Sequence, residues 1–368
     1  MKSATHKEGR STVPADSPRL TRRQLLYRGG ATTLALSGLP LLGPGQVLAA
    51  SKTLTIMTVG GSWGDAIKQM IAEPFAKKHD VDLAWDNRPN AQQIAAIQAM
   101  KGNPTADTAE MGGPRMGHAI SLGLVDPIDP DKAPSFARVH PSFKNDYWAA
   151  RGVAPWVLTF NKNAVSREEV EARGWDILVD PRFKGRVAIP KVGWMGEMWL
   201  NAVNLAEGGS YDNLDVPIEL ASRIIKDNDG LVMASNDQGM KMFTSEEILV
   251  APFWSGRTYQ LQDKGVPIDF VYPQGWSFYG FGFVLLSGGP NQDLVTKFID
   301  FSLSPEVQLT VARRFSYLPT LTGLHIPDDM PRVKIDPKVL DRAANIDYSE
   351  VIKYSDKHLE RWNKEVLG

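Results

Sequence analysis

The chain has 368 residues, with 41 basic and 42 acidic side chains and no cysteine. This length is typical of one to three domains, and a hydrophobic fraction of 43% is sufficient for large cores. The lack of cysteine excludes a disulfide framework, a thiolate metal site and lipid attachment through cysteine.

Residues 1–50 have the layout of an export signal peptide. Arg22-Arg23, followed by Gln24-Leu25-Leu26, resembles the twin-arginine signal, which is read by a receptor and is not an anchor. An apolar region from Ala31 to Leu48 leads to small residues at Ala49-Ala50. Glycine and proline interrupt this region, so it suits cleavage better than the alternative, a retained membrane anchor. We therefore predict a soluble periplasmic protein, exported by the twin-arginine (Tat) machinery and without a lipid anchor.

The charge balance of the remaining chain is mildly acidic. Residues 1–50 contain seven of the basic and two of the acidic side chains, which leaves 34 basic and 40 acidic, a net charge of −6. No run of five or more basic residues is present after residue 50. These features exclude nucleic acid as an expected partner and argue against binding to an anionic membrane surface.

Strand and helix patterns alternate along the chain. Apolar runs rich in β-branched residues predict strands, and apolar residues at three- and four-residue spacing predict helices. In the first part, strands are expected at 53–59, 81–86 and 106–112, and helices at 65–79, 90–102 and 115–125. This order favours an α/β fold with a largely parallel sheet.

The middle and end of the chain continue this pattern. Ser166, with Glu169 three residues on, forms a capping box at the start of a helix. Strands are expected at 154–162, 246–254, 267–273 and 281–287, and helices at 166–174, 195–209, 216–228, 291–304, 305–315 and 347–366. Two α/β lobes would hold these elements, and the seam between lobes is the usual place for a ligand.

Several stretches in order resemble the periplasmic solute-binding proteins of ATP-driven (ABC) importers, in the group that includes spermidine/putrescine-binding proteins. The most specific is Trp175-Asp176-x-Leu178, continued by Asp180-Pro181 and Gly185. The others lie at 60–83, 106–129, 154–162, 251–275 and 290–320. The resemblance covers the whole chain after the export signal.

The resemblance implies a two-lobed type II binding-protein fold that closes by a hinge motion around its solute. The first lobe would hold 51–157 plus 280–325, and the second 160–277 plus 328–368. The implied partners are a small organic solute, a membrane permease and its ATPase. We expect the protein to be a monomer that needs no cofactor.

If the resemblance holds, four stretches face the cleft between the lobes. The turn at Gly61, Ser62 and Trp63 offers backbone N–H groups and a flat apolar ring, although a tight turn with a core tryptophan is the alternative. Trp194 stands where polyamine binders have acidic residues, and Glu197 beyond it suits the first turn of a helix.

The other two stretches add more aromatic side chains. Trp254 matches an aromatic of the family cleft, and Arg257 has the geometry to clamp a carboxylate unless it forms a surface salt bridge. Trp276 and Tyr279 begin the fourth stretch, where the aspartate expected of a polyamine binder is replaced by Phe281.

These departures determine the expected solute. A buried diamine needs carboxylates, because an unpaired charge in a closed cleft is very costly. We therefore predict a small solute with an apolar or aromatic body and a carboxylate, held by Arg257 and the amides of Gly61–Trp63. A polyamine, or a quaternary ammonium in an aromatic cage, is the alternative.

A secreted serine hydrolase is the competing class of function. Gly60-Gly61-Ser62-Trp63-Gly64 spells the G-x-S-x-G motif of a nucleophile elbow. However, the motif follows the first strand after the export signal, no HGGG-type stretch precedes it, and no histidine stands in a recognisable catalytic loop. H-E-x-x-H, EF-hand and Tyr-Tyr patterns are also absent from the sequence, so we predict neither catalysis nor a metal site.

Overall fold

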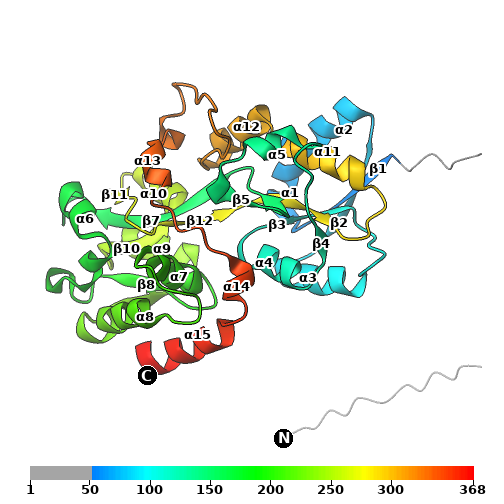
Figure 1. Cartoon of the computed structure of the whole chain (residues 1–368). Helices are drawn as coiled ribbons and strands as arrows, with labels where there is room; N and C mark the ends of the chain where they lie inside the picture. The colour runs from blue at the N-terminus through cyan, green and yellow to red at the C-terminus, as the bar shows by residue number, and fades with distance from the viewer. Residues whose placement is uncertain (1–51) are drawn as a thin grey trace, which may run out of the picture. The chain divides into compact units, whose positions relative to one another are not determined.

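The computed structural model describes residues 52–368, apart from the side chains of Ser62 and Ala91. The predicted export signal at 1–50 lies outside the described residues. The described part contains two main sheets, each with its own hydrophobic cluster, and Figure 1 shows them as two groups of elements.

The first sheet has the strand order β2-β1-β3-β13-β4. Its three leading strands, β1 (Thr53–Thr58), β2 (Asp82–Asn87) and β3 (Thr108–Met111), are parallel, as the alternating pattern predicts. The late strand β13 (Gly282–Leu286) joins antiparallel between β3 and β4 (Val125–Asp126). The strand pairing thus brings a segment from the last third of the chain into the first sheet.

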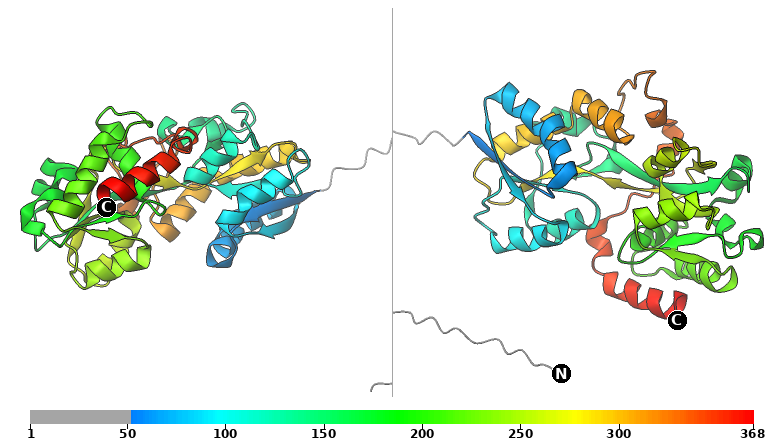
Figure 2. Two further views of the ribbon diagram at one scale, coloured as in Figure 1. Left: turned by 90° about the horizontal axis from the view of Figure 1, so that it is seen from below. Right: turned by 180° about the vertical axis from the view of Figure 1, so that it is seen from behind.

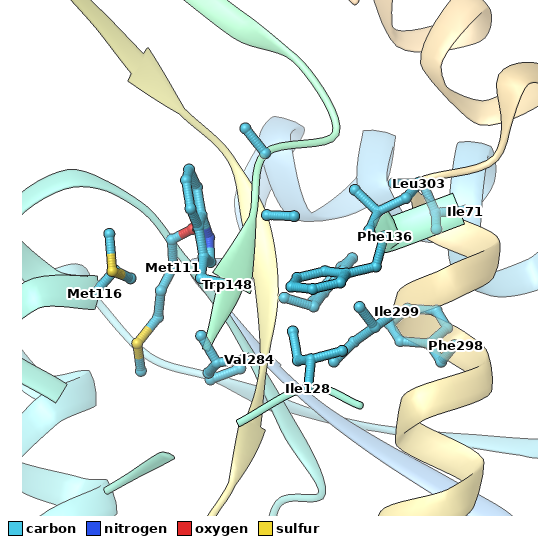
Figure 3. Packing of buried hydrophobic residues seen from close by; sticks show 14 of the residues in the cluster. Ile71, Met111, Met116, Ile128, Phe136, Trp148, Val284, Phe298, Ile299 and Leu303 are labelled. Atoms are coloured by element: carbon cyan, nitrogen blue, oxygen red, sulfur yellow. The ribbon is translucent and has the colours of Figure 1, made fainter. Parts of the chain in front are cut away.

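Helices connect these strands and cover the sheet. They are α1 (Gly61–Ile67), α2 (Glu73–His79), α3 (Asn90–Ala99), α4 (Gly113–Ser121) and α5 (Pro134–Arg138), with α11 (Gln292–Ser302) and α12 (Pro305–Phe315) added from later in the chain. A π-helical turn at Lys68–Ala72 links α1 to α2, and the helical run begins at Gly61, earlier than predicted. Figure 3 shows Ile71, Phe136 and Leu303 meeting in the resulting core.

The second sheet is centred on β7 (Val153–Asn161), which is buried along its whole length. On one edge β7 pairs with β10 (Val250–Trp254), and on the other with β11 (Ile268–Val271) and β12 (Ser277–Gly280). All three pairings are antiparallel, so the expectation of a largely parallel sheet is wrong for this half. Alternation of strands and helices cannot fix strand direction, because a long connection can return to either end of a sheet.

Smaller elements surround the second sheet. The parallel pair β8 (Ala188–Pro190) and β9 (Leu231–Met233) lies beside it, with helices α6 (Arg167–Arg173), α7 (Gly196–Ala206), α8 (Asp215–Ser222), α9 (Asn236–Thr244) and α10 (Ser255–Gln262). Ser166 accepts a hydrogen bond from the Glu169 backbone N–H at 3.2 Å, which confirms the predicted N-cap of α6.

Short elements complete the fold. They are β5 (Lys144–Asn145), β6 (Trp148–Ala149), α13 (Pro337–Leu340), the 3-10 turns at 141–143, 174–179, 181–183 and 331–333, and π-helical turns at 223–227 and 362–366. The helix predicted over 347–366 is divided into α14 (Tyr348–Val351), α15 (Ser355–Arg361) and the last π-helical turn.

The two hydrophobic clusters are joined by strands and by the C-terminal segment. β7 begins with Val153, which packs in the first cluster, and Trp156, further along the strand, packs in the second. β12 leads after one residue into β13 of the first sheet. Tyr348 of the second cluster packs against α4, where a Cβ on Gly117 would stand 2.4 Å from the Tyr348 carbonyl carbon. Both views in Figure 2 show α14 reaching toward the first group of helices while α15 stays with the second.

Candidate functional site

Trp63 stands at the start of α1 and anchors the first of two aromatic groups. Gly60 and Gly61 have φ angles of 70° and 59°, a backbone conformation that favours glycine, and they turn the chain from β1 into α1. The indole N–H of Trp63 donates to Glu110 Oε2 at 2.7 Å. Its ring lies 4.8 Å from Phe281 and 5.0 Å from Phe315, between ring centroids.

A buried ion pair lies beneath this aromatic group. Glu110, on β3, pairs with Arg151 and also accepts from the Thr58 hydroxyl at 3.1 Å. The two charged side chains are 4% and 1% exposed, so neither is held by bulk water. The Arg151 guanidinium also lies over the Phe283 ring. Trp63 is therefore held by a buried ion pair that the sequence pattern did not reveal.

Tyr317 completes the first aromatic group, and the start of α10, which carries Arg257, is its neighbour. The Tyr317 and Phe281 rings are stacked, with centroids 5.3 Å apart and planes inclined by 1°. Burial raises the pKa of the Tyr317 hydroxyl to about 12, and the positive charges of Arg257 and Arg151 partly oppose this rise. The start of α10 lies next to this group, because a Cβ on Gly256 would stand 3.5 Å from the Phe315 carbonyl oxygen.

Arg257 forms no ion pair with any carboxylate of residues 52–368. Its Nη1 donates to Gln260 Oε1 at 2.9 Å, one turn further along α10, and the side chain is half-buried. The surface salt bridge that was the alternative for Arg257 is therefore absent from the described part of the chain. The guanidinium keeps donors that a carboxylate could accept from in bidentate geometry.

A second aromatic group surrounds Trp156 on β7. Trp254 at the end of β10 and Trp194 before α7 both pack edge-on against Trp156, at centroid distances of 4.6 and 5.6 Å. Trp156 is fully buried, whereas Trp194 and Trp254 are half-buried and keep part of their rings accessible. The structure thus brings two predicted site residues together around a third that sequence reasoning missed.

The predicted residues of the fourth stretch have different environments. The Tyr279 hydroxyl donates to the Gly112 carbonyl at 2.9 Å, and its ring lies so close to Gly113 that a Cβ there would stand 2.6 Å from it. Trp276 is fully buried and its indole N–H donates to the Val339 carbonyl at 2.8 Å. In this conformation Trp276 therefore belongs to the core and offers no surface to a solute.

Glu197 stands in the first turn of α7, as predicted, but it is not simply solvated. Its Oε1 lies 3.4 Å from Nδ1 of the buried His358, whose Nε2 faces the Tyr211 carbonyl at 2.8 Å. Nearby, burial raises the pKa of the Tyr348 hydroxyl, and Tyr279 and Glu197 add to this rise. The C-terminal segment thus reaches the same region as the predicted residues.

Ser62 and the cavities give no independent support for a site. The Ser62 side chain lies outside the described residues. One cavity of about 150 Å³ is bounded by Met116, Phe278 and Tyr348, and another of about 350 Å³ lies beside α12. Neither is lined by a predicted solute residue. Within residues 52–368 no cluster of three or more His, Asp or Glu side chains is placed to hold a metal ion.

Residues missed at the sequence level come mainly from segments distant in sequence. Glu110, Arg151, Phe315 and Tyr317 are separated by up to 207 positions along the chain, as their numbers show. Of these residues, only Phe315, the last residue of α12, and Tyr317 stand close together in the sequence. A charged residue inside an apolar strand, such as Glu110, could have been noticed in the sequence. Because carboxylates are almost never fully buried without a partner, its position predicts an ion pair, although it does not say with which residue.

Two main sheets, each with its own hydrophobic cluster and joined by crossing strands, give residues 52–368 a two-lobed α/β architecture. Comparison with known proteins gives the family. A family model described as bacterial extracellular solute-binding protein matches residues 104–342, more than half of the chain. The chain therefore belongs to the bacterial extracellular solute-binding proteins.

Curated relatives and solved structures agree with this family. The chain is 23% identical to a gamma-aminobutyric acid-binding protein of Pseudomonas aeruginosa, over 90% of this chain and 95% of the relative. It is 24% identical to the spermidine/putrescine-binding periplasmic protein of Escherichia coli, over 83% and 86%. Its fold is similar to that of an ABC transporter protein from Clostridium perfringens, with TM-score 0.75 and 21% identity over 85% of this chain and 99% of the other. A similar match is AttC of Agrobacterium tumefaciens in an open unliganded conformation, with TM-score 0.71 and 20% identity over 85% and 99%.

Proposed function

We propose that the protein captures a small carboxylate-bearing solute with an apolar or aromatic body and delivers it to a membrane permease and its ATPase. The observation that carries this proposal is Arg257, a half-buried guanidinium without a carboxylate partner in residues 52–368, close to Tyr317. A cation of this kind near aromatic faces is suited to the charged end of an anionic solute.

The proposed solute contacts come from both aromatic groups. Trp63 and Tyr279 would contribute from the first sheet and the crossing strands, and Trp194 and Trp254 from the second sheet. The backbone N–H groups of Gly61–Trp63 would assist Arg257. Because Trp276 is buried in this structure, we propose no direct solute contact for it in this conformation.

The proposed lobes follow the two hydrophobic clusters. Residues 51–157 and 280–325 would form the first lobe, and residues 160–277 with the C-terminal segment 328–368 the second. Met330 and Val333 pack in the first cluster, whereas Ala344 and Val366 pack in the second. We therefore place the return of the chain to the second lobe after Val333.

Relatives support both the carboxylate and the alternative. Gamma-aminobutyric acid carries a carboxylate and an ammonium group, and it is the named ligand of one relative. A polyamine or quaternary ammonium is favoured by the aromatic faces and by Glu197, which is the acidic side chain of the Lys191–Glu197 stretch. Glu197 is next to His358 and Phe281 replaces the expected aspartate, so the carboxylate remains the better candidate.

Export and assembly belong to the same proposal. We place the protein in the periplasm, exported by the twin-arginine machinery, soluble, without a lipid anchor, monomeric and without catalytic activity. The twin arginines and the lack of cysteine support this placement. Within residues 52–368, no helix is both long enough and apolar enough to cross a membrane.

A thermal-shift screen tests the solute class. The purified protein would be heated with 4-aminobutyrate, 4-hydroxyphenylacetate, putrescine, spermidine and glycine betaine, each at the same concentration. Ligands that bind only the folded state raise the unfolding temperature. We expect carboxylates to stabilise the protein, and stabilisation by putrescine or spermidine alone would contradict the proposal.

A further inference from the structure

Two buried polar side chains lie side by side behind the second aromatic group. Trp156 on β7 is paired in register with Ser277 on β12 and, across its other edge, with Trp254 on β10. Directly opposed residues of antiparallel strands place their side chains on the same face of the sheet. Trp254, Trp156 and Ser277 therefore form a row across one face, with Trp194 packed on its centre.

Trp156 and Ser277 each have a polar atom without a partner in the described part of the chain. Trp156 is fully buried and Ser277 is 1% exposed, yet neither the Trp156 indole N–H nor the Ser277 hydroxyl forms a hydrogen bond with any described residue. Buried polar groups in folded proteins are nearly always satisfied, because an unmade hydrogen bond costs stability. The two groups belong to directly opposed residues on neighbouring strands, so one acceptor between them would satisfy both.

The chemistry of the two groups limits what they can bind. An indole N–H can only donate, and a serine hydroxyl can donate as well. Neither is charged, so they suit an uncharged oxygen better than a buried carboxylate, which needs a positive partner. An ammonium group has only donors and is excluded from the indole.

We propose that Trp156 and Ser277 form the floor of the solute site and bind an uncharged oxygen, such as a hydroxyl or carbonyl, at the end of the solute opposite its carboxylate. This inference rests on the proposed function, since Arg257 is assigned to the carboxylate. Trp194 and Trp254 are both partly accessible and pack edge-on against Trp156, and they would hold the apolar body of the solute. The floor thus selects carboxylates that carry a second oxygen.

Matched solutes and matched serine variants test the floor. The dissociation constants of 4-hydroxyphenylacetate and phenylacetate, and of 4-hydroxybutyrate and butyrate, would be measured by calorimetry. The wild type should bind the oxygen-bearing member of at least one pair about tenfold more tightly, and Ser277→Ala should abolish most of that preference. Trp156→Phe, which removes the N–H, should act in the same direction.

A stability measurement separates this role from a structural one. Ser302 is also 1% exposed, but its hydroxyl donates to the Ile299 carbonyl at 2.7 Å, within the first hydrophobic cluster region. Ser302→Ala should lower the unfolding temperature measured without solute and leave all four dissociation constants unchanged. Ser277→Ala should leave the unfolding temperature unchanged or raise it, because it removes an unpartnered group.

The outcomes distinguish a failure of the floor from a failure of the proposed function. If the wild type binds the carboxylates but shows no preference for the second oxygen, or if Ser277→Ala keeps that preference, the floor is refuted and the proposed function stands. If Ser277→Ala lowers the solute-free unfolding temperature as much as Ser302→Ala does, the hydroxyl has a structural partner and the inference fails. If the wild type binds none of the four carboxylates, the proposed solute class fails and the floor fails with it.

Discussion

Removal of the Glu110 side chain should be unusually costly, because it leaves an arginine charge buried. Glu110 is 4% exposed and is the acidic partner of Arg151, which is 1% exposed. It also accepts from the Trp63 indole N–H at 2.7 Å and from the Thr58 hydroxyl at 3.1 Å. Glu110→Ala therefore removes one ion pair and two hydrogen bonds from a single place.

The expected loss follows from burial. Breaking a buried ion pair by removing one partner costs about 3–5 kcal/mol, mostly because the remaining charge stays buried and unpaired. Glu110→Gln keeps an oxygen that can accept from Trp63 and should cost about 1–3 kcal/mol less than Glu110→Ala. The double variant Glu110→Gln with Arg151→Met removes both charges, so it should recover stability relative to the sum of the single changes by about 2 kcal/mol or more.

Urea unfolding followed by circular dichroism measures these differences, provided that the transition is checked for a single step. The prediction for Glu110→Ala is a midpoint shift that corresponds to about 3–5 kcal/mol. A loss below about 1 kcal/mol, the size of a surface ion pair, would refute the view that Trp63 rests on a buried charge pair. Additive effects in the double variant would refute the pairing itself.

Three further changes probe other parts of the account. Arg257→Ala should raise the dissociation constant of a bound carboxylate about tenfold or more with little change in unfolding temperature, and an unchanged constant would exclude Arg257 from the site. Gly117→Val should lower the free energy of unfolding by about 1–3 kcal/mol, because a Cβ there would stand 2.4 Å from the Tyr348 carbonyl carbon. Gly256→Ala is the control and should be neutral, because its Cβ would stand 3.5 Å from the Phe315 carbonyl oxygen, an ordinary contact distance. Arg182 and Arg173 hold the pKa of Asp180 well below its usual range, so Asp180→Asn should cost about 1–3 kcal/mol at neutral pH. A carboxyl with a depressed folded-state pKa stabilises the fold above its unfolded pKa, so this difference should be constant above about pH 5, begin to shrink as pH falls below about 4, and disappear only as pH falls through the much lower folded-state pKa; a pH-independent difference over that range would contradict the ion-pair explanation.

Local patterns predicted the elements well where the burial of a strand or helix is reflected in its own sequence. The strands at 53–59 and 154–162 agree with β1 and β7 within a residue or two, because continuous apolar runs match strands covered on both faces. The capping box at Ser166 was also predictable, since it depends on only four consecutive residues. The C-terminal helix was predicted too long, because its apolar spacing continues across Ile352–Tyr354 while the chain bends there to pack α14 on α4.

The site was predictable only in part, and the reason is distance along the chain. Trp254 and Trp194 were identified through the resemblance, but their common neighbour Trp156 lies inside a strand whose pattern indicates only core. Glu110 and Arg151 become partners because β3 and the segment before β7 meet in space. No local pattern encodes that meeting, and the same holds for the approach of Arg257 to Tyr317.

The central claim is that the protein binds a small carboxylate through aromatic faces and Arg257. Its most direct test is mass spectrometry of the small molecule that is released when the purified protein is denatured, compared with Arg257→Ala prepared in the same way. We expect the wild type to release a low-mass carboxylate that also carries an uncharged oxygen, and the variant to release much less of it. Release of putrescine, spermidine or a quaternary ammonium, in equal amounts from both proteins, would contradict the claim.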